Sequence, residues 1–179
     1  FVHLVDSATI DMDLALKTPD IDFKQILSLI PAVYAKDFAA LKTAGDVNLS
    51  AVAKGRMQGE NLPSFDVNLE IIDAMLKYPD LPSDIKGINI KARATNPGGV
   101  ADLTVVDVPS LKFNMAGNPF EARVGLKTPV SDPDFDFGAK GKIDLGKLKD
   151  VVPLDSMLMN GVLVADLDAK GKLSYVENE

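Results

Sequence analysis

The sequence predicts a mainly β, α+β fold in which about nine or ten antiparallel strands form a long curved sheet, a sandwich or a half-barrel, with two short helices packed on it. Three observations lead to this prediction. Apolar and polar residues alternate over most of the 179 residues, as in strands that bury one face. Turn-forming residues separate the alternating segments at short intervals, which favours antiparallel neighbours. One sequence pattern also occurs twice and indicates an internal pseudo-repeat.

Six segments alternate clearly. They are 10–16, 47–53, 65–71, 88–94, 111–115 and 120–126. The apolar members of the last four segments are the candidate functional residues, because they would line either an apolar groove or a packed core. These residues are Phe65, Val67, Leu69, Ile71, Ile88, Ile90, Leu111, Phe113, Phe120, Val124 and Leu126.

Turn residues stand between these segments. Asn, Pro and Gly cluster at 96–99, 117–119 and 160–161, and together with Gly138 and Gly141 they supply the preset or positive φ that tight reversals need. The segment Tyr-Pro-Asp-Leu-Pro at 78–82 is the most distinctive unrepeated one. We interpret it as a stiff crossing whose Tyr78 and Leu81 pack at the edge of the sheet.

Two segments have a helical spacing of apolar residues and are predicted to be short helices that cover the sheet as lids. Each follows an aspartate that can cap a helix, Asp22 or Asp144, and each stops before a proline. The apolar residues of the two lids are Phe23, Ile26 and Ile30 in the first, and Leu145, Leu148 and Val152 in the second.

The repeated pattern comprises three blocks in one order. Leu-Lys-Thr-Pro occurs at 16–19 and 126–129, the lid segment begins at 21 and 143, and Ala-Lys-Gly occurs at 53–55 and 169–171. The second copy carries an additional twelve residues before its lid, about one strand. We therefore expect one domain over 1–179, with pseudo-repeat units at about 10–57 and 120–173 joined by a β-rich segment at 58–119.

Composition excludes several classes of function. The formal net charge is −7 with a pI near 4.7 and no dense Lys/Arg run, so nucleic acid is not an expected partner. There is no cysteine, which excludes disulfides and thiolate chemistry. The apolar stretches are shorter than the roughly 18 residues of a membrane-spanning helix. The first residues resemble the inside of a strand and lack an initiator methionine, so we expect a piece of a longer protein.

Candidate chemistry is sparse. The single histidine, His3, has no triad pattern around it, and no nucleophile elbow, Walker loop or dinucleotide fingerprint occurs. Asp132, Asp134 and Asp136 alternate as in a calcium loop, but the expected glycine and the terminal acidic ligand are misplaced. We interpret these aspartates as outward residues of a strand. We expect no enzymatic activity, no metal and no cofactor.

Several segments, most of them turns or the ends of strands, resemble a known protein family. They are 78–82, 88–99, 117–119, 126–129, 131–133 and 141–145, which together lie within half to two thirds of the chain. This set resembles the carboxy-terminal region of AsmA-family proteins of the Bacteroides type, relatives of TamB and the bridge-like lipid transfer proteins. The resemblance implies a periplasmic segment of a protein anchored in the inner membrane of a Gram-negative bacterium and involved in outer-membrane biogenesis. It also implies a curved sheet with an apolar groove for lipid, and it supplies no catalytic residues.

Two functional hypotheses follow from these observations. In the first, the apolar face forms or continues a groove that handles phospholipid or another lipid. In the second, the chain is a structural or interaction module with a closed β core that docks other envelope proteins. A third option is a carbohydrate- or surface-binding domain. Alternation does not separate the first two, because a row that faces a groove and a row that faces a core have the same pattern.

Overall fold

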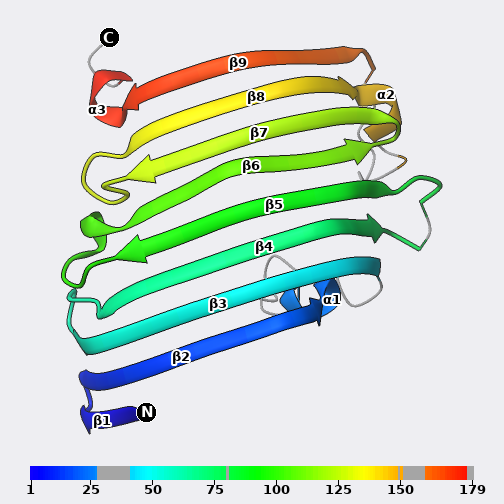
Figure 1. Ribbon diagram of the computed structural model, residues 1–179. Helices are drawn as coiled ribbons and strands as arrows, with labels where there is room; N and C mark the ends of the chain where they lie inside the picture. The colour runs from blue at the N-terminus through cyan, green and yellow to red at the C-terminus, as the bar shows by residue number, and fades with distance from the viewer. Residues whose placement is uncertain (28–40, 80, 149, 151–159, 177–179) are drawn as a thin grey trace.

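The computed structural model describes residues 1–27, 41–79, 81–148, 150 and 160–176. Nine strands form one antiparallel sheet in strict chain order, and the sheet does not close on itself (Figure 1). The strands are β1 Val2–Asp6, β2 Thr9–Asp22, β3 Lys42–Gln58, β4 Ser64–Lys77, β5 Ile85–Asn96, β6 Val105–Met115, β7 Asn118–Lys127, β8 Asp134–Asp144 and β9 Val162–Lys172. The short helices are α1 Phe23–Leu27, the 3-10 turn η2 Ala101–Leu103, α2 Leu145–Leu148 and α3 Leu173–Val176.

The predicted fold class is confirmed, and the structure selects among its alternatives. The chain forms a long open sheet, and the described residues contribute no second sheet that would make a sandwich. All six alternating segments lie in strands, β2 to β7, and most of the additional residues of the second repeat lie in β8. The turn prediction for Gly138 and Gly141 was wrong, because both lie inside β8. The structure adds α3 and η2, which were not predicted.

The register gives the sheet two chemically opposite faces. Successive residues of a strand point to opposite sides, and paired residues share a side. One continuous rung joins Leu16, Ala51, Val67, Ala94, Val106, Leu126, Phe135 and Gly171 across β2 to β9. The neighbouring positions, such as Asn68 paired with Arg93, point to the other side. We call the first side the apolar face and the second the polar face.

The buried core occupies only one end of the apolar face. It consists of Phe23, Leu41, Val47, Ile71, Ala74 and Ile88. Tyr78 packs against this cluster, next to the central strands β4 and β5, whereas the prediction placed it together with Leu81 at the edge of the sheet. Leu81 is not among the residues packed against the cluster. Gly45 makes the close approach possible, since a Cβ there would lie 2.4 Å from the Ala74 Cα, and its φ of 116° suits glycine. The core is therefore a corner in which α1 meets β3, β4 and β5.

Both predicted lid helices begin where expected. Asp22 Oδ1 accepts a hydrogen bond from the Lys24 backbone N–H at 2.8 Å, and Asp144 Oδ1 accepts one from the Gly146 N–H at 3.0 Å. These are helix N-cap bonds, as predicted. Both helices lie at the same end of the sheet and α3 at the other (Figure 1). Ile26 lies in α1 and Leu148 in α2, whereas Ile30 and Val152 fall outside the described residues.

The two copies of the repeat occupy matching places in the sheet. Lys54 of the first Ala-Lys-Gly pairs with Asp13 at 3.3 Å, and Lys170 of the second pairs with Asp136 at 3.4 Å. In each case the lysine lies on the strand after the lid and the aspartate on the strand before it. The Leu-Lys-Thr-Pro blocks differ, because 16–19 lies within β2 whereas 126–129 begins at the end of β7.

Candidate functional site

The candidate site is the apolar face, and the register brings together all eleven residues predicted for it. They lie on β4 to β7, where Ile71 opposes Ile90, Ile90 opposes Leu111, and Phe113 opposes Phe120. The two rings of Phe113 and Phe120 stack with their centroids 5.2 Å apart. Gly141 of β8 lies opposite Phe120 and provides its space, since a Cβ there would fall 2.6 Å from the Phe120 ring.

The face extends well beyond the predicted residues. Strands β1 to β3 add Leu4, Met12, Leu14 and Leu16, and the alanine row of β3, whereas β8 and β9 add Phe135, Phe137, Leu163 and Leu167. The alternation in β2, β3 and β8 was visible in the sequence. The alternation at 163–171 in β9 was not predicted from the sequence. The signal was present, because every odd-numbered residue of this segment is uncharged, whereas four of the even-numbered residues of β9 are charged. At the paired positions of the described strands, this face carries no charged side chain.

Exposure changes steeply across the face. Val47 is fully buried beside α1, and Ile71 and Ile88 are nearly so. Towards the two outer strands the side chains become open to solvent: Leu16 of β2 is 49% exposed and Leu167 of β9 is 50% exposed. Among the described residues the buried side chains of this face gather at the lid corner, and Met115 and Ala139 are the buried apolar residues outside that cluster. The sheet therefore provides the floor of an apolar site, and the described residues place no wall opposite it.

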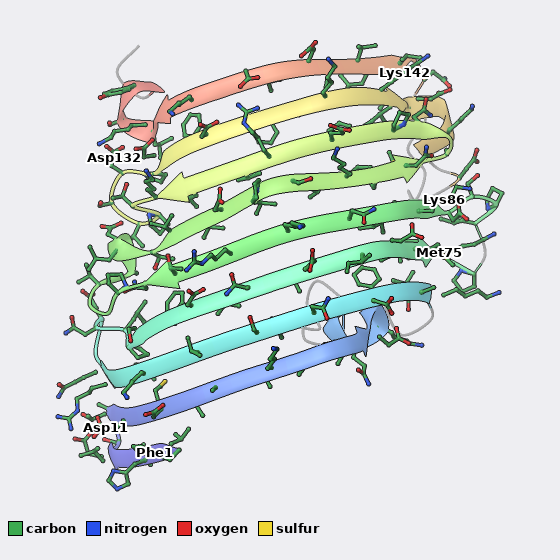
Figure 2. All side chains as sticks on the ribbon, in the orientation of Figure 1. Phe1, Asp11, Met75, Lys86, Asp132 and Lys142 are labelled. Atoms are coloured by element: carbon green, nitrogen blue, oxygen red, sulfur yellow. The ribbon has the colours of Figure 1, made fainter. Side chains whose placement is uncertain are left out.

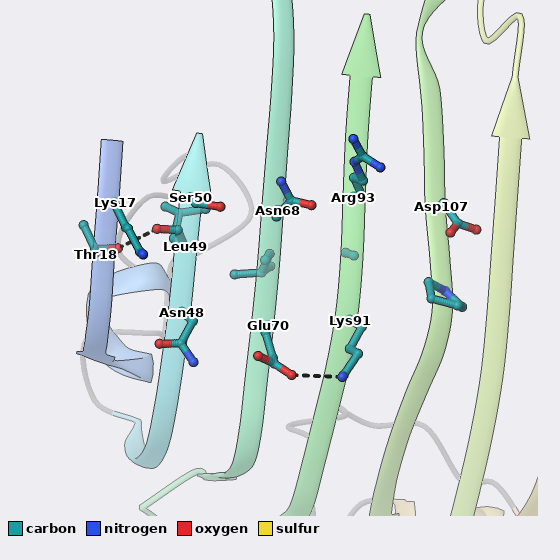
Figure 3. Close-up of a pocket in the computed structure, with 13 residues that line it drawn as sticks. Lys17, Thr18, Asn48, Leu49, Ser50, Asn68, Glu70, Lys91, Arg93 and Asp107 are labelled. Carbon is teal, nitrogen blue, oxygen red and sulfur yellow. Dashed lines mark hydrogen bonds and ion pairs between the residues drawn. The ribbon is translucent and has the colours of Figure 1, made fainter. Parts of the chain in front are cut away.

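The polar face holds a shallow hollow of about 490 Å³ that crosses β2 to β6 (Figure 3). Polar side chains from successive strands point into it, among them Lys17, Ser50, Asn68 and Arg93, and Glu70 pairs with Lys91 at 3.1 Å. Because both signs of charge line it and most of them are already paired, the hollow has no strong preference for one kind of ligand.

Ion pairs between neighbouring strands are spread over the polar face. Asp11 pairs with Arg56 at 2.7 Å and Asp66 with Arg93 at 2.5 Å. Hydrogen bonding and the positive charge of the Arg93 guanidinium lower the pKa of the Asp66 carboxyl. The labelled Asp11 and Asp132 lie at one end of the sheet, and Lys86 and Lys142 at the end that carries the lids (Figure 2).

Arg123 links three strands on the polar face. Its guanidinium reaches from β7 across Gly138 of β8 and pairs with both Asp136 and Asp168, the latter on β9. Only a glycine leaves room for it, since a Cβ at 138 would lie 2.0 Å from an Arg123 nitrogen. The hydrogen bond from Arg123 lowers the pKa of the Asp168 carboxyl. The outermost strand is thus tied to the sheet by a side chain two strands away.

The residues considered for catalysis or metal binding, His3 and the aspartates at 132, 134 and 136, lie far from one another or take part in the fold. His3 is exposed on the short edge strand β1. Asp134 and Asp136 lie in β8 as predicted, whereas the strand prediction was wrong for Asp132, which lies in a bend before β8. There Asp132 accepts hydrogen bonds from the Ser174 backbone N–H and hydroxyl and so anchors α3. Within 1–27, 41–79, 81–148, 150 and 160–176, no three His, Cys, Asp or Glu side chains come together as metal ligands do.

Comparison with known proteins assigns no relative: no family model, no curated protein and no solved structure matches the chain. Over the described part of the chain, none of the helices has the length and apolar character needed to cross a membrane. The fold and the site together define an open β-sheet with one apolar and one polar face.

Proposed function

We propose that this chain is a non-enzymatic, lipid-handling segment of an envelope protein, with the apolar face as the surface that takes acyl chains. One observation carries the proposal: the face runs across nine strands without a charged side chain at its paired positions in the described residues, and it stays half exposed at both flanks. The resemblance to AsmA-family proteins supports a periplasmic location, a parent protein anchored in the inner membrane and a role in outer-membrane biogenesis.

The physical reason is the cost of leaving such a face in water. Fully burying a leucine or isoleucine side chain contributes roughly 1.5–3 kcal/mol. Side chains such as Leu14, Leu16, Leu163 and Leu167 realise only about half of that in the chain alone. Exposed apolar patches larger than a few hundred Å² mark interaction sites in proteins. A flexible acyl chain can cover the rows between strands without the fixed shape complementarity that a protein partner needs.

The test is lipid retention by two matched variants. Leu16→Glu places a charge on the apolar face, and Val52→Glu places the same charge on the polar face of the adjacent strand. The two wild-type side chains are equally accessible, 49% and 52% exposed, so both variants should fold. After incubation with phospholipid vesicles and repurification, native mass spectrometry should find bound phospholipid on the wild type and on Val52→Glu.

Leu16→Glu should retain much less lipid, because a carboxylate in contact with an acyl chain loses its hydration. Wild-type protein that emerges lipid-free would sink the proposal, and so would equal retention by the two variants. Circular dichroism of both variants controls for folding.

A further inference from the structure

The two edge strands of the sheet differ in how well they resist pairing with another strand. β1 is five residues long and has a bulge between Leu4 and Asp6. β9 is eleven residues long and pairs with β8 at eleven positions without a shift in register. On its other side β9 has no partner strand among the residues that the structure describes. Long, regular edge strands are templates for strand addition.

β9 lacks several of the devices that protect an edge, although it carries Lys170 and Lys172 on its polar face. It contains no proline, and its positions on the apolar face, Leu163, Ala165, Leu167, Ala169 and Gly171, include no inward charge. α3 follows β9 without covering the edge, because the Leu173 N–H bonds to the Pro133 carbonyl and Ser174 bonds to Asp132, both on the β8 side. Among the residues that the structure describes, α3 therefore leaves the outer edge of β9 uncovered.

Each charge on the polar face of β9 already has a partner within its own sheet: Lys140 for Asp166, Arg123 for Asp168, Asp136 for Lys170 and Asp132 for Lys172. Between two copies, the order of these charges still favours one partner and one register. Their order is Asp166, Asp168, Lys170, Lys172, two negative charges followed by two positive ones. A second β9 running antiparallel about a two-fold axis at Ala169 sets Asp168 opposite Lys170 and Asp166 opposite Lys172, each twice. An axis at Leu167 sets Asp166 opposite Asp168 twice, whereas an axis at Asp168 or Lys170 combines one like-charge pair with two opposite-charge pairs. The axis at Ala169 is the one that gives opposite-charge pairs throughout.

We propose that β9 is a homodimer interface, in which it pairs antiparallel with β9 of a second copy about a two-fold axis at Ala169. The axis is perpendicular to the sheet, so the apolar faces of the two copies lie on the same side and form one continuous surface. Such an isologous contact closes as a dimer and does not propagate. This inference stands independently of lipid handling, since it rests on the edge and not on the face.

The absence of cysteine from the chain allows a direct test. In the proposed register the two Ala169 side chains lie directly opposite, with Cβ atoms about 4.5–5.5 Å apart, close to the separation that a disulfide spans. Ala169→Cys in the full chain should therefore form a disulfide-linked dimer under mild oxidation. Ala165→Cys is the matched control on the same strand and face. Its two copies would lie about 27 Å apart and should not link.

Light scattering coupled to gel filtration measures the interaction without cross-linking. The wild type should be a dimer that dissociates on dilution. Lys170→Glu, which sets Glu against Asp168 twice, should raise the dimer dissociation constant by roughly tenfold or more. Lys86→Glu changes the net charge equally at a distant lysine, beside Asp84 on the lid end of the sheet, and should leave the constant unchanged.

Three results would each overturn the inference. They are a wild type that stays monomeric at the highest attainable concentration, equal linking of Ala169→Cys and Ala165→Cys, and growth into larger assemblies rather than dimers. Lipid retention measured on the same samples separates a failure of the dimer from a failure of the proposed function.

Discussion

The corner of the apolar face beneath α1 and the outer parts of that face are built from the same kinds of side chain, yet they differ in burial. In the corner, Val47 and Ala74 are completely buried. On the flanking strands, Leu14 and Leu163 remain about half exposed although they occupy equivalent places on the same face. What separates the two regions is a covering element: α1 and Leu41 pack over the corner.

The difference shows that alternation predicts which side of a strand is apolar. It does not predict which element, if any, covers that side. A buried aliphatic side chain contributes its full transfer free energy to folding, whereas a half-exposed one contributes only part of it. The exposed part can contribute to binding when a partner covers it. The corner therefore stabilises the sheet, and the flanks are the part of the face available for binding.

The largest expected effect comes from deleting matched side chains in the two regions. Ile71→Ala in the corner should lower the free energy of unfolding by about 2–4 kcal/mol, because it leaves a cavity among packed neighbours. Leu14→Ala on the flank should cost about 1 kcal/mol or less, since water already reaches that side chain. Urea unfolding followed by circular dichroism measures both. Equal losses would contradict the division of the face into two regions.

A smaller effect is expected at the glycines of β7 and β8. Gly141→Ala should destabilise by about 1–3 kcal/mol, because the new Cβ would lie 2.8 Å from the Pro119 carbonyl oxygen and against the Phe120 ring. Gly125→Ala is the control, since its Cβ would make ordinary contact with Asp136 at 3.5 Å. That variant should be neutral or slightly stabilising in the same urea experiment. A harmless Gly141→Ala would show that Phe120 does not need the space over β8.

The two lids provide the next comparison. Asp22→Ala removes the N-cap of α1 and should cost about 1 kcal/mol, because α1 covers the corner. Asp144→Ala removes the corresponding bond of α2, which lies outside the buried cluster, and should cost less. Thermal unfolding of the two variants gives the order. A larger effect of Asp144→Ala would reverse the assignment of α1 as the main covering element.

The smallest expected effect is on the pH dependence of the free energy of unfolding. It arises on the polar face, which carries ion pairs beside both regions. Arg93 lowers the pKa of Asp66 below its usual 3.8, so this pair stabilises the folded state fully above that value and loses its contribution as the pH falls through the lowered pKa. In Arg93→Gln, stability should therefore fall less between about pH 6 and about pH 3 than in the wild type.

Asp66→Asn should reduce the pH dependence to the same extent, and the double variant should reduce it no further. Urea midpoints at the two pH values provide the measurement. A double variant whose pH dependence equals the sum of the two single reductions would show that the residues act independently.

Much of the fold could be predicted from local patterns. The rows 10–16 to 120–126, both capping aspartates and the additional strand of the second repeat all lie where the sequence places them. The ion pairs over Gly138 could not be predicted, because Arg123 and Asp168 are far apart in the chain and meet only through the order of β7, β8 and β9. The extent of the candidate site was underestimated for the same reason.

By itself, the sequence determined the alternation of strands, the chemistry of the two faces and the positions of the lids. These are local properties, set by a side-chain period of two and by the capping bonds of single aspartates. Only the tertiary structure decided that the sheet stays open, that α1 buries one corner, and that no described strand pairs with the outer side of β9. Those outcomes depend on which distant segments meet, and residues such as Leu14 and Val47 carry no local signal that distinguishes a covered position from an exposed one.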